Sequence, residues 1–271
     1  MKKQFIILFF VLAMVIGALG YTPWVLASRG LLQWPVGLSI IFTIIGGGSP
    51  TFAAIIVTLL QYGKRGPDYL FKQYNPRKTP WPWFPVSILL PLGIAVFTIA
   101  LWIPFNNTYS LNKNDLAQFF PLLISNFAIN MWEEIGWRGY ATPTLQRKYS
   151  ALITSLIVGV VWALWHWPFF AVLNSQMAPN YHNSYPLFMI FTIFSSIIYT
   201  WLYNSSKSSL LVVSLFHATT NTVNLMLFSK AGIGYDVSLF YFATVMVIAV
   251  ILIPVFGPRY LSRSGIVTPL E

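Results

Sequence analysis

Long apolar runs separated by short polar joints dominate the chain. The runs lie near residues 5–27, 31–62, 85–104, 116–132, 151–173, 186–203, 209–228 and 237–256. A bilayer core about 30 Å thick is crossed by about 20 helical residues. The pattern therefore predicts an all-α, polytopic membrane protein of about eight transmembrane helices, forming a single integral-membrane domain over residues 1–271.

The run at 31–62 is too long for one upright crossing and too short for two crossings with a turn. Its middle contains Gly46-Gly47-Gly48-Ser49-Pro50, which is expected to break or bend a helix. We interpret this run as one interrupted or tilted crossing. The N-terminus resembles a signal peptide, but its apolar run is long and seven more follow, so we expect an uncleaved signal anchor.

The composition excludes several classes of protein. Only 8% of the 271 residues are charged and 56% are hydrophobic, whereas an average soluble domain is roughly 25% charged. A soluble globular enzyme and a disordered chain are therefore excluded. The chain has no cysteine, which rules out thiol catalysis, disulfides and cysteine-ligated metal.

The net charge of +10 comes from basic residues in the joints between runs. This placement favours contact with membrane lipids, and we expect no nucleic-acid partner. With eight crossings, one side receives Lys2, Lys3, Lys64, Arg65, Lys72, Arg77, Lys78, Arg147, Lys148, Lys207, Arg259 and Arg263, and the other side receives Arg29, Lys113 and Lys230. The positive-inside rule then predicts that both termini are cytoplasmic, in what we interpret as a bacterial cell membrane.

Two adjacent carboxylates, Glu133 and Glu134, follow the fourth run. On a helix, Glu134 and Arg138 are i,i+4 neighbours and can pair. Glu133 points about 100° away from Glu134, so it escapes that pair and is available as a general base for water. The alternative is an ion pair that only anchors the end of a helix.

Two of the three histidines lie inside apolar runs. His166 is surrounded in sequence by three tryptophans and a proline, within Trp162–Pro168, and His217 and Asn221 are i,i+4 neighbours. Taken singly, each could be a packing residue or a polar contact between helices. Together with Glu133 they predict a water-activating site in a polar cavity, or a divalent metal site. We interpret His182 as a surface residue.

Three motifs in this order, Glu133-Glu134-x-x-x-Arg138, Trp162-x-x-x-His166 and His217-x-x-x-Asn221, resemble the CPBP family. These are intramembrane proteases related to type II CAAX prenyl endopeptidases, also described as Abi or bacteriocin-processing and self-immunity proteins. The family-like catalytic core covers about residues 116–228. Trp162 stands where the family usually has Phe, so aromatic character is kept.

The resemblance implies a role for each matched residue. Glu133 and His166 position and activate water, His217 and Asn221 bind water or stabilise the oxyanion, and Glu134 and Arg138 hold the site in shape. The family has been described both as metal-dependent and as metal-free. If a divalent ion such as Zn²⁺ is bound, its ligands would come from Glu133, His166 and His217, with Glu134 as a further candidate.

The expected function is therefore intramembrane hydrolysis of a peptide bond in a small or membrane-associated substrate, possible roles being bacteriocin maturation and self-immunity. A non-catalytic immunity or scaffold protein that binds a toxin or receptor is the alternative. A proton-coupled transporter would also place ionisable groups inside the membrane. It would be expected to show inverted repeats and polar residues in more of the runs, and the sequence shows neither.

Overall fold

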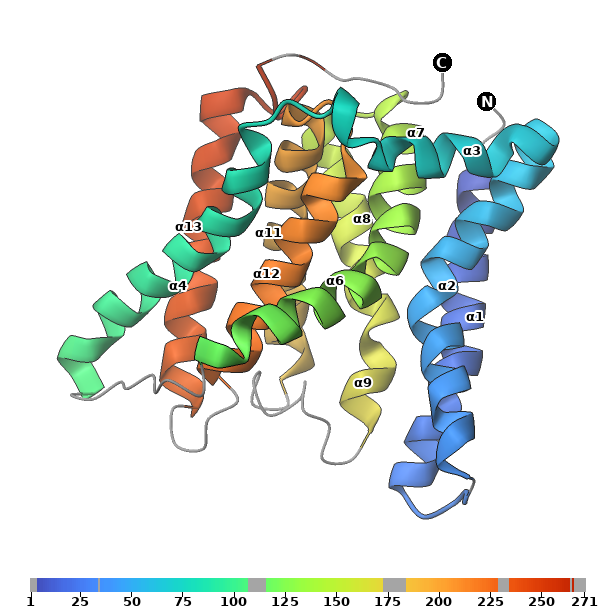
Figure 1. Cartoon of the computed structure of the whole chain (residues 1–271), viewed down its shortest axis with the longest axis horizontal. Helices are drawn as coiled ribbons and strands as arrows, with labels where there is room; N and C mark the ends of the chain where they lie inside the picture. Colours follow the sequence, from blue (N-terminus) through green and yellow to red (C-terminus); the bar gives the residue numbers. More distant parts are fainter. Residues whose placement is uncertain are drawn as a thin grey trace.

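The computed structural model describes residues 4–33, 35–106, 116–172, 184–228, 234–263 and 265. Over these residues the chain is a bundle of helices without strands (Figure 1). The helices are α1 (Gln4–Ser28), α2 (Val36–Tyr62), α3 (Gly66–Phe71), α4 (Trp83–Asn106), α6 (Phe119–Gly136), α7 (Thr142–Gln146), α8 (Ala151–Trp165), α9 (Trp167–Ala171), α11 (Tyr185–Ser205), α12 (Leu210–Phe228) and α13 (Gly234–Phe256). The all-α membrane fold is confirmed.

Six helical segments in the described part of the chain are long and apolar enough to cross a membrane: Gln4–Ser28, Gly37–Tyr74, Trp83–Phe105, Ala151–Ala171, Tyr185–Ser205 and Leu239–Phe256. Two of the eight runs are missing from this set. The run of α12 counts only as a shorter apolar helix, Leu210–Met226, and α6 lies obliquely across the bundle (Figure 1). Both helices carry buried polar residues, which lower their hydropathy.

The second run is one segment, as expected, but an interruption of it is wrong, because α2 continues through Pro50 as a single helix. The glycines permit close packing instead of breaking the helix. A Cβ on Gly20 of α1 would lie 2.3 Å from the backbone nitrogen of Gly46, and one on Gly46 would lie 2.7 Å from the ring of Tyr21. The glycine-rich stretch therefore lets α1 and α2 form a tight pair.

The two ends of the bundle differ in charge. The first helix begins and the last helix ends at the same end (Figure 1). The segments at this end, which we name the cationic face, carry Lys64, Arg65, Lys72, Arg77, Lys78, Arg147, Lys148, Lys207, Arg259 and Arg263. Arg29 follows α1 at the opposite end, and Lys2, Lys3, Lys113 and Lys230 lie outside the described residues. That the cationic face is cytoplasmic stays a prediction.

Candidate active site

The two adjacent glutamates lie in the last turn of α6, where the chain enters a π-helical turn, Trp137–Ala141. Such turns occur often at functional sites. Arg138 in this turn donates from Nη1 to Oε1 of Glu134 at 3.1 Å, and both side chains are fully buried. The ion pair expected from the i,i+4 spacing is therefore present.

Glu134 has a second partner that the spacing did not reveal. Nδ1 of His217, on α12, lies 2.8 Å from the same Oε1 atom. A carboxylate oxygen accepts, so the hydrogen-bond network assigns the ring proton to Nδ1. Glu134 thus orients His217 and leaves its Nε2 atom available to the site, as carboxylates do for functional histidines.

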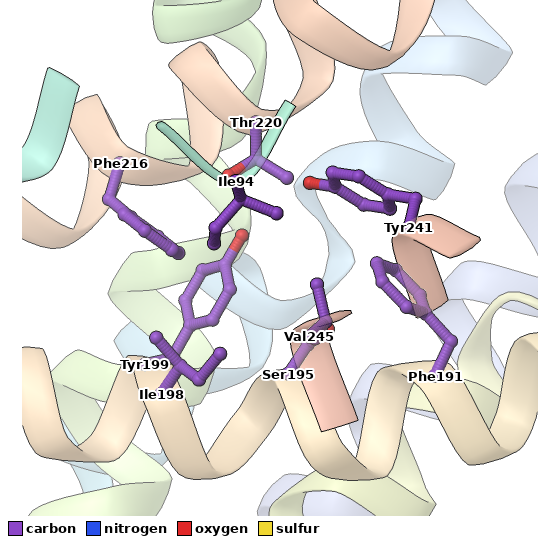
Figure 2. A pocket seen from close by; sticks show the side chains of 9 residues that line it. All are labelled: Ile94, Phe191, Ser195, Ile198, Tyr199, Phe216, Thr220, Tyr241 and Val245. Carbon is purple, nitrogen blue, oxygen red and sulfur yellow. The ribbon is translucent and has the colours of Figure 1, made fainter. Parts of the chain in front are cut away.

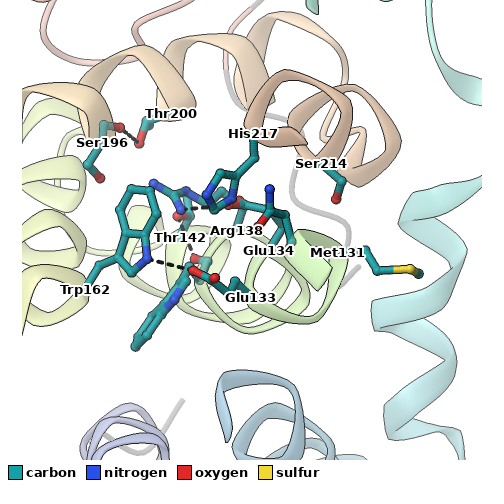
Figure 3. A network of polar contacts seen from close by, with 12 residues as sticks. Met131, Glu133, Glu134, Arg138, Thr142, Trp162, Ser196, Thr200, Ser214 and His217 are labelled. Carbon is teal, nitrogen blue, oxygen red and sulfur yellow. Dashed lines mark hydrogen bonds and ion pairs between the residues drawn. The ribbon is translucent and has the colours of Figure 1, made fainter. Parts of the chain in front are cut away.

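Glu133 is separated from this pair, as expected. Its Oε2 atom accepts a hydrogen bond of 3.0 Å from the indole nitrogen of Trp162 on α8 (Figure 3). Its side chain is 8% exposed, and it forms no ion pair with any residue that the structure describes. Glu133 is therefore a buried carboxylate that is positioned by a neutral donor.

The helix is interrupted at His166, which lies between the end of α8 and the beginning of α9. Pro168 follows two residues later and cannot continue the hydrogen-bonding pattern of α8. The backbone N–H of His166 bonds to the carbonyl of Ala163, so the carbonyl of Trp162 is available to the imidazole. Nδ1 of His166 lies 2.8 Å from that carbonyl oxygen and must carry the ring proton, which leaves Nε2 as an acceptor.

Of the three tryptophans near His166 in sequence, two surround its ring. The ring centroids of Trp165 and Trp162 lie 4.7 and 5.7 Å from that of His166. Trp167 is 54% exposed and packs against Tyr185 instead. Phe188 of α11, 5.0 Å away, completes the aromatic wall. The apolar surroundings predicted for His166 are present, with part of the wall supplied by another helix.

Arg138 is held between two aromatic rings. Its guanidinium carbon lies 4.2 Å from the ring centre of Trp162 and 4.3 Å from that of Tyr199 on α11. Stacking of this kind stabilises a desolvated cation. Tyr199 also contacts His217, with ring centroids 5.4 Å apart. Nothing in the spacing of the motifs had indicated this tyrosine.

Asn221 has a partner that the motifs did not include. Its Nδ2 atom donates to Oδ1 of Asn130 on α6 at 3.2 Å. A sequence signal for Asn130 does exist, because Asn126, Asn130, Glu134 and Arg138 repeat every four residues and so share one helix face. Asn221 thus lies beside His217 on α12, with its amide group bonded to the partner helix.

Two contacts fix the carboxyl end of α6 against α2. Gly136 packs on Pro50 so closely that a Cβ at position 136 would lie 2.4 Å from Cβ of Pro50. The hydroxyl of Thr51 donates to the backbone carbonyl of Trp132. The Gly-Pro stretch of α2 therefore serves the site by setting the position of the turn that carries Glu133 and Glu134.

A small cavity lies between α4, α11, α12 and α13 on the hydroxyl side of Tyr199 (Figure 2). The residues that line it are Ile94, Phe191, Ser195, Ile198, Tyr199, Phe216, Thr220, Tyr241 and Val245. Glu133, His166 and His217 do not line it. The cavity therefore adjoins the candidate site through Tyr199 and is not the site itself.

Among the described residues, Glu133, His166 and His217 do not form a three-ligand metal site. Across the described ranges, no three His, Asp or Glu side chains are grouped closely enough to hold a metal ion. The Nδ1 atoms of His166 and His217 are engaged with Trp162 and Glu134, which leaves Nε2 of each ring as the atom that could bind an ion. Because Glu133, His166 and His217 do not fit a ligand cluster here, we derive no chemical step through a metal. His182 lies outside the described residues.

Comparison with known proteins agrees with the motifs. Residues 115–223 match the family model described as type II CAAX prenyl endopeptidase Rce1-like. The chain is also 30% identical, over 162 residues, to the CAAX prenyl protease 2 of Methanococcus maripaludis, a match that covers 57% of this chain and 60% of that relative. The chain thus spans less than two thirds of the relative's length. Residues 115–223, which contain all three motifs, are therefore similar to the Rce1-like, type II CAAX prenyl endopeptidase family.

Proposed function

We propose that the chain is an intramembrane endopeptidase that hydrolyses a peptide bond by means of water activated by Glu133 and His166. One observation carries the proposal: a buried carboxylate without an ionic partner among the described residues is held by Trp162. The ring of Trp162 also contacts both His166 and His217, whose Nδ1 atoms are already engaged. General-base catalysis needs a positioned proton acceptor of this kind. The similarity to a CAAX prenyl protease supports the same reaction class.

In this mechanism Glu133 accepts a proton from water while Nε2 of His166 orients that water as a hydrogen-bond acceptor. The hydroxide forms a C–O bond to the scissile carbonyl carbon. The C–N bond then breaks, and the proton held by Glu133 passes to the leaving amine. The proton count is balanced, and the two products are a carboxylic acid and an amine.

His217 would serve the tetrahedral intermediate. When protonated, it donates through Nε2 to the oxyanion, while Glu134 accepts from Nδ1 and stabilises the imidazolium. Asn221 lies one helical turn away on the same face and is proposed to assist in binding water or the oxyanion. Glu134 and Arg138 would shape the site, because their buried pair fixes the orientation of His217.

The substrate that we propose is a small or membrane-associated peptide. The aromatic wall around His166 offers an apolar surface to such a substrate. Maturation of a bacteriocin-like peptide, or self-immunity by degradation of one, is the cellular role that we favour in what we take to be a bacterial membrane. The CAAX specificity in the relative's name would require a prenylated cysteine in the substrate.

The test is Glu133→Gln, which keeps the size of the side chain and removes its basicity. We expect peptide cleavage by the purified protein to fall by at least about a hundredfold, with the thermal unfolding midpoint unchanged within a few degrees. Asp68→Asn, at an exposed carboxylate in α3, is the matched control and should keep full activity.

Full cleavage by Glu133→Gln would overturn the assigned role. In a toxin-survival assay, protection should be lost in Glu133→Gln and His166→Ala. A protein that acts only by binding a toxin or receptor would keep protection in both variants.

A further inference from the structure

A line of buried polar contacts joins α6 to α12. It consists of His217 to Glu134 at 2.8 Å, Asn221 to Asn130 at 3.2 Å and, further from the site, Asn126 to Thr222 at 3.0 Å. We name these six residues the polar seam. The residues on α6 recur every four positions, so one helix face carries amide groups from the site toward the beginning of α6.

Some buried polar atoms along the polar seam have no hydrogen-bonding partner among the described protein groups. Asn130 is 1% exposed, and its Nδ2 atom has no hydrogen-bonding partner within the described part of the chain. The same holds for Oδ1 of Asn224, which lies on the same face of α12 as His217 and Asn221. Buried polar atoms are almost always bonded to protein or to water, so both atoms point to a partner from solvent.

On α6 the polar seam becomes more exposed with distance from the site, whereas on α12 Thr222 is fully buried. The exposed fraction is 0% at Glu134, 1% at Asn130 and 9% at Asn126. In the opposite direction, toward the cationic face, Tyr74 bridges α6 and α12. Its hydroxyl is bonded both to the carbonyl of Met131 and to Ser214.

We propose that the polar seam conducts water to the Glu133–His166–His217 site from the end of the bundle at which α6 begins, opposite the cationic face (Figure 1). The proposal rests on the proposed function, because a hydrolase enclosed by helices consumes water and must admit it. Asn130 and Asn224 bind this water in transit through Nδ2 and Oδ1, respectively. Tyr74 prevents entry along the same helix pair from the cationic face.

The natural absence of cysteine allows a direct test. Single substitutions Asn126→Cys and Asn130→Cys are labelled, in the full chain in membranes, with a charged, membrane-impermeant thiol reagent applied to one face at a time. The matched controls are Ile124→Cys and Ile129→Cys, which neighbour these positions but are 70% and 59% exposed on the apolar surface of α6. A thiol in lipid does not ionise and reacts poorly.

We expect both seam cysteines to react at least about tenfold faster than their controls, because thiolates form only where water is present, and only from the face opposite the cationic one. Rates equal to those of the controls, or labelling from the cationic face alone, would overturn the proposal. If Asn130→Cys fails to fold, the same labelling rates are measured on Asn126→Cys and Asn224→Cys instead. Labelling does not require cleavage, so a failure of the seam and a failure of the proposed hydrolysis are observed separately.

Discussion

At the scale of single residues, Trp162 contacts Glu133, His166 and Arg138 of the candidate site. Its indole nitrogen positions Glu133, its carbonyl accepts from His166, and its ring covers the guanidinium of Arg138. The motif spacing indicated only that this position is aromatic. An indole adds a hydrogen-bond donor that a phenyl ring lacks. A Trp at this position, in place of the Phe that is usual in the family that the motifs resemble, therefore has a chemical consequence in this chain.

Replacing Trp162 by Phe should separate these contributions. The phenyl ring keeps the contact with Arg138 and loses the 3.0 Å hydrogen bond to Glu133. Because a hydrogen bond to a charged group contributes about 1.5–3 kcal/mol, we expect kcat to fall by about tenfold or more, with little change in KM. Steady-state cleavage kinetics measure the two parameters. An unchanged kcat would show that the indole N–H does not position the base.

The arrangement of Glu133, His166 and His217 predicts that activity does not depend on a divalent metal ion. Activity should survive incubation with a strong chelator, because the proposed water activation uses side chains alone. Metal analysis of the purified protein is the measurement, with His166→Ala and His217→Ala as comparisons. A stoichiometric divalent ion that is bound by the wild type and lost in both variants would contradict this expectation and support a Zn²⁺ site.

At the scale of elements, the site depends on how closely α6 approaches α2. The i,i+4 rule predicted the Glu134–Arg138 pair from spacing alone, since both residues belong to one helical stretch. The same rule could not predict that Gly136 packs on Pro50, or that His217 of α12 binds Glu134. These contacts join segments far apart in sequence, and helix periodicity carries no information about which helices become neighbours.

Gly136→Ala should therefore destabilise the protein. The new methyl group would lie 2.4 Å from Cβ of Pro50 and 2.5 Å from its carbonyl carbon, and overpacking of this kind costs about 1–3 kcal/mol. Thermal unfolding in detergent is the measurement. Gly139→Ala, in the adjacent π-helical turn, is the control. Its Cβ would lie 3.0 Å from the tip of Leu210 and 3.7 Å from Nε2 of Gln73 and the carbonyl oxygen of Glu134, so its unfolding midpoint should shift less. Equal midpoints for the two variants would refute the role of the α2–α6 contact.

At the scale of the whole molecule, the bundle separates charge between its two ends. Basic residues that are scattered along the sequence gather on the cationic face, because successive crossings return the chain to the same end (Figure 1). Anionic headgroups and the membrane potential favour basic residues on the cytoplasmic side. The candidate site lies between the two ends, where its few ionisable groups are shielded by apolar helices.

The orientation can be tested in the cysteine-free chain. Lys148→Cys lies on the cationic face, and Leu31→Cys lies in the turn after α1 at the opposite end, where Leu31 is 71% exposed. An impermeant thiol reagent added to intact cells should label position 31 and spare position 148, and opening the cells should make both reactive. The reverse pattern would invert the predicted topology.

The sequence by itself determined the membrane class, most of the spans and the motif residues, because apolar run length and local i,i+4 spacing are properties of contiguous residues. It also predicted that Glu134 pairs with Arg138 and that Glu133 stays outside this pair. Only the tertiary structure decided that the Gly-Pro stretch of α2 packs without breaking its helix, that His217 bonds to Glu134, and that Trp162 positions Glu133. The physical reason is that these contacts arise between helices, where fit and burial select partners that no local pattern specifies.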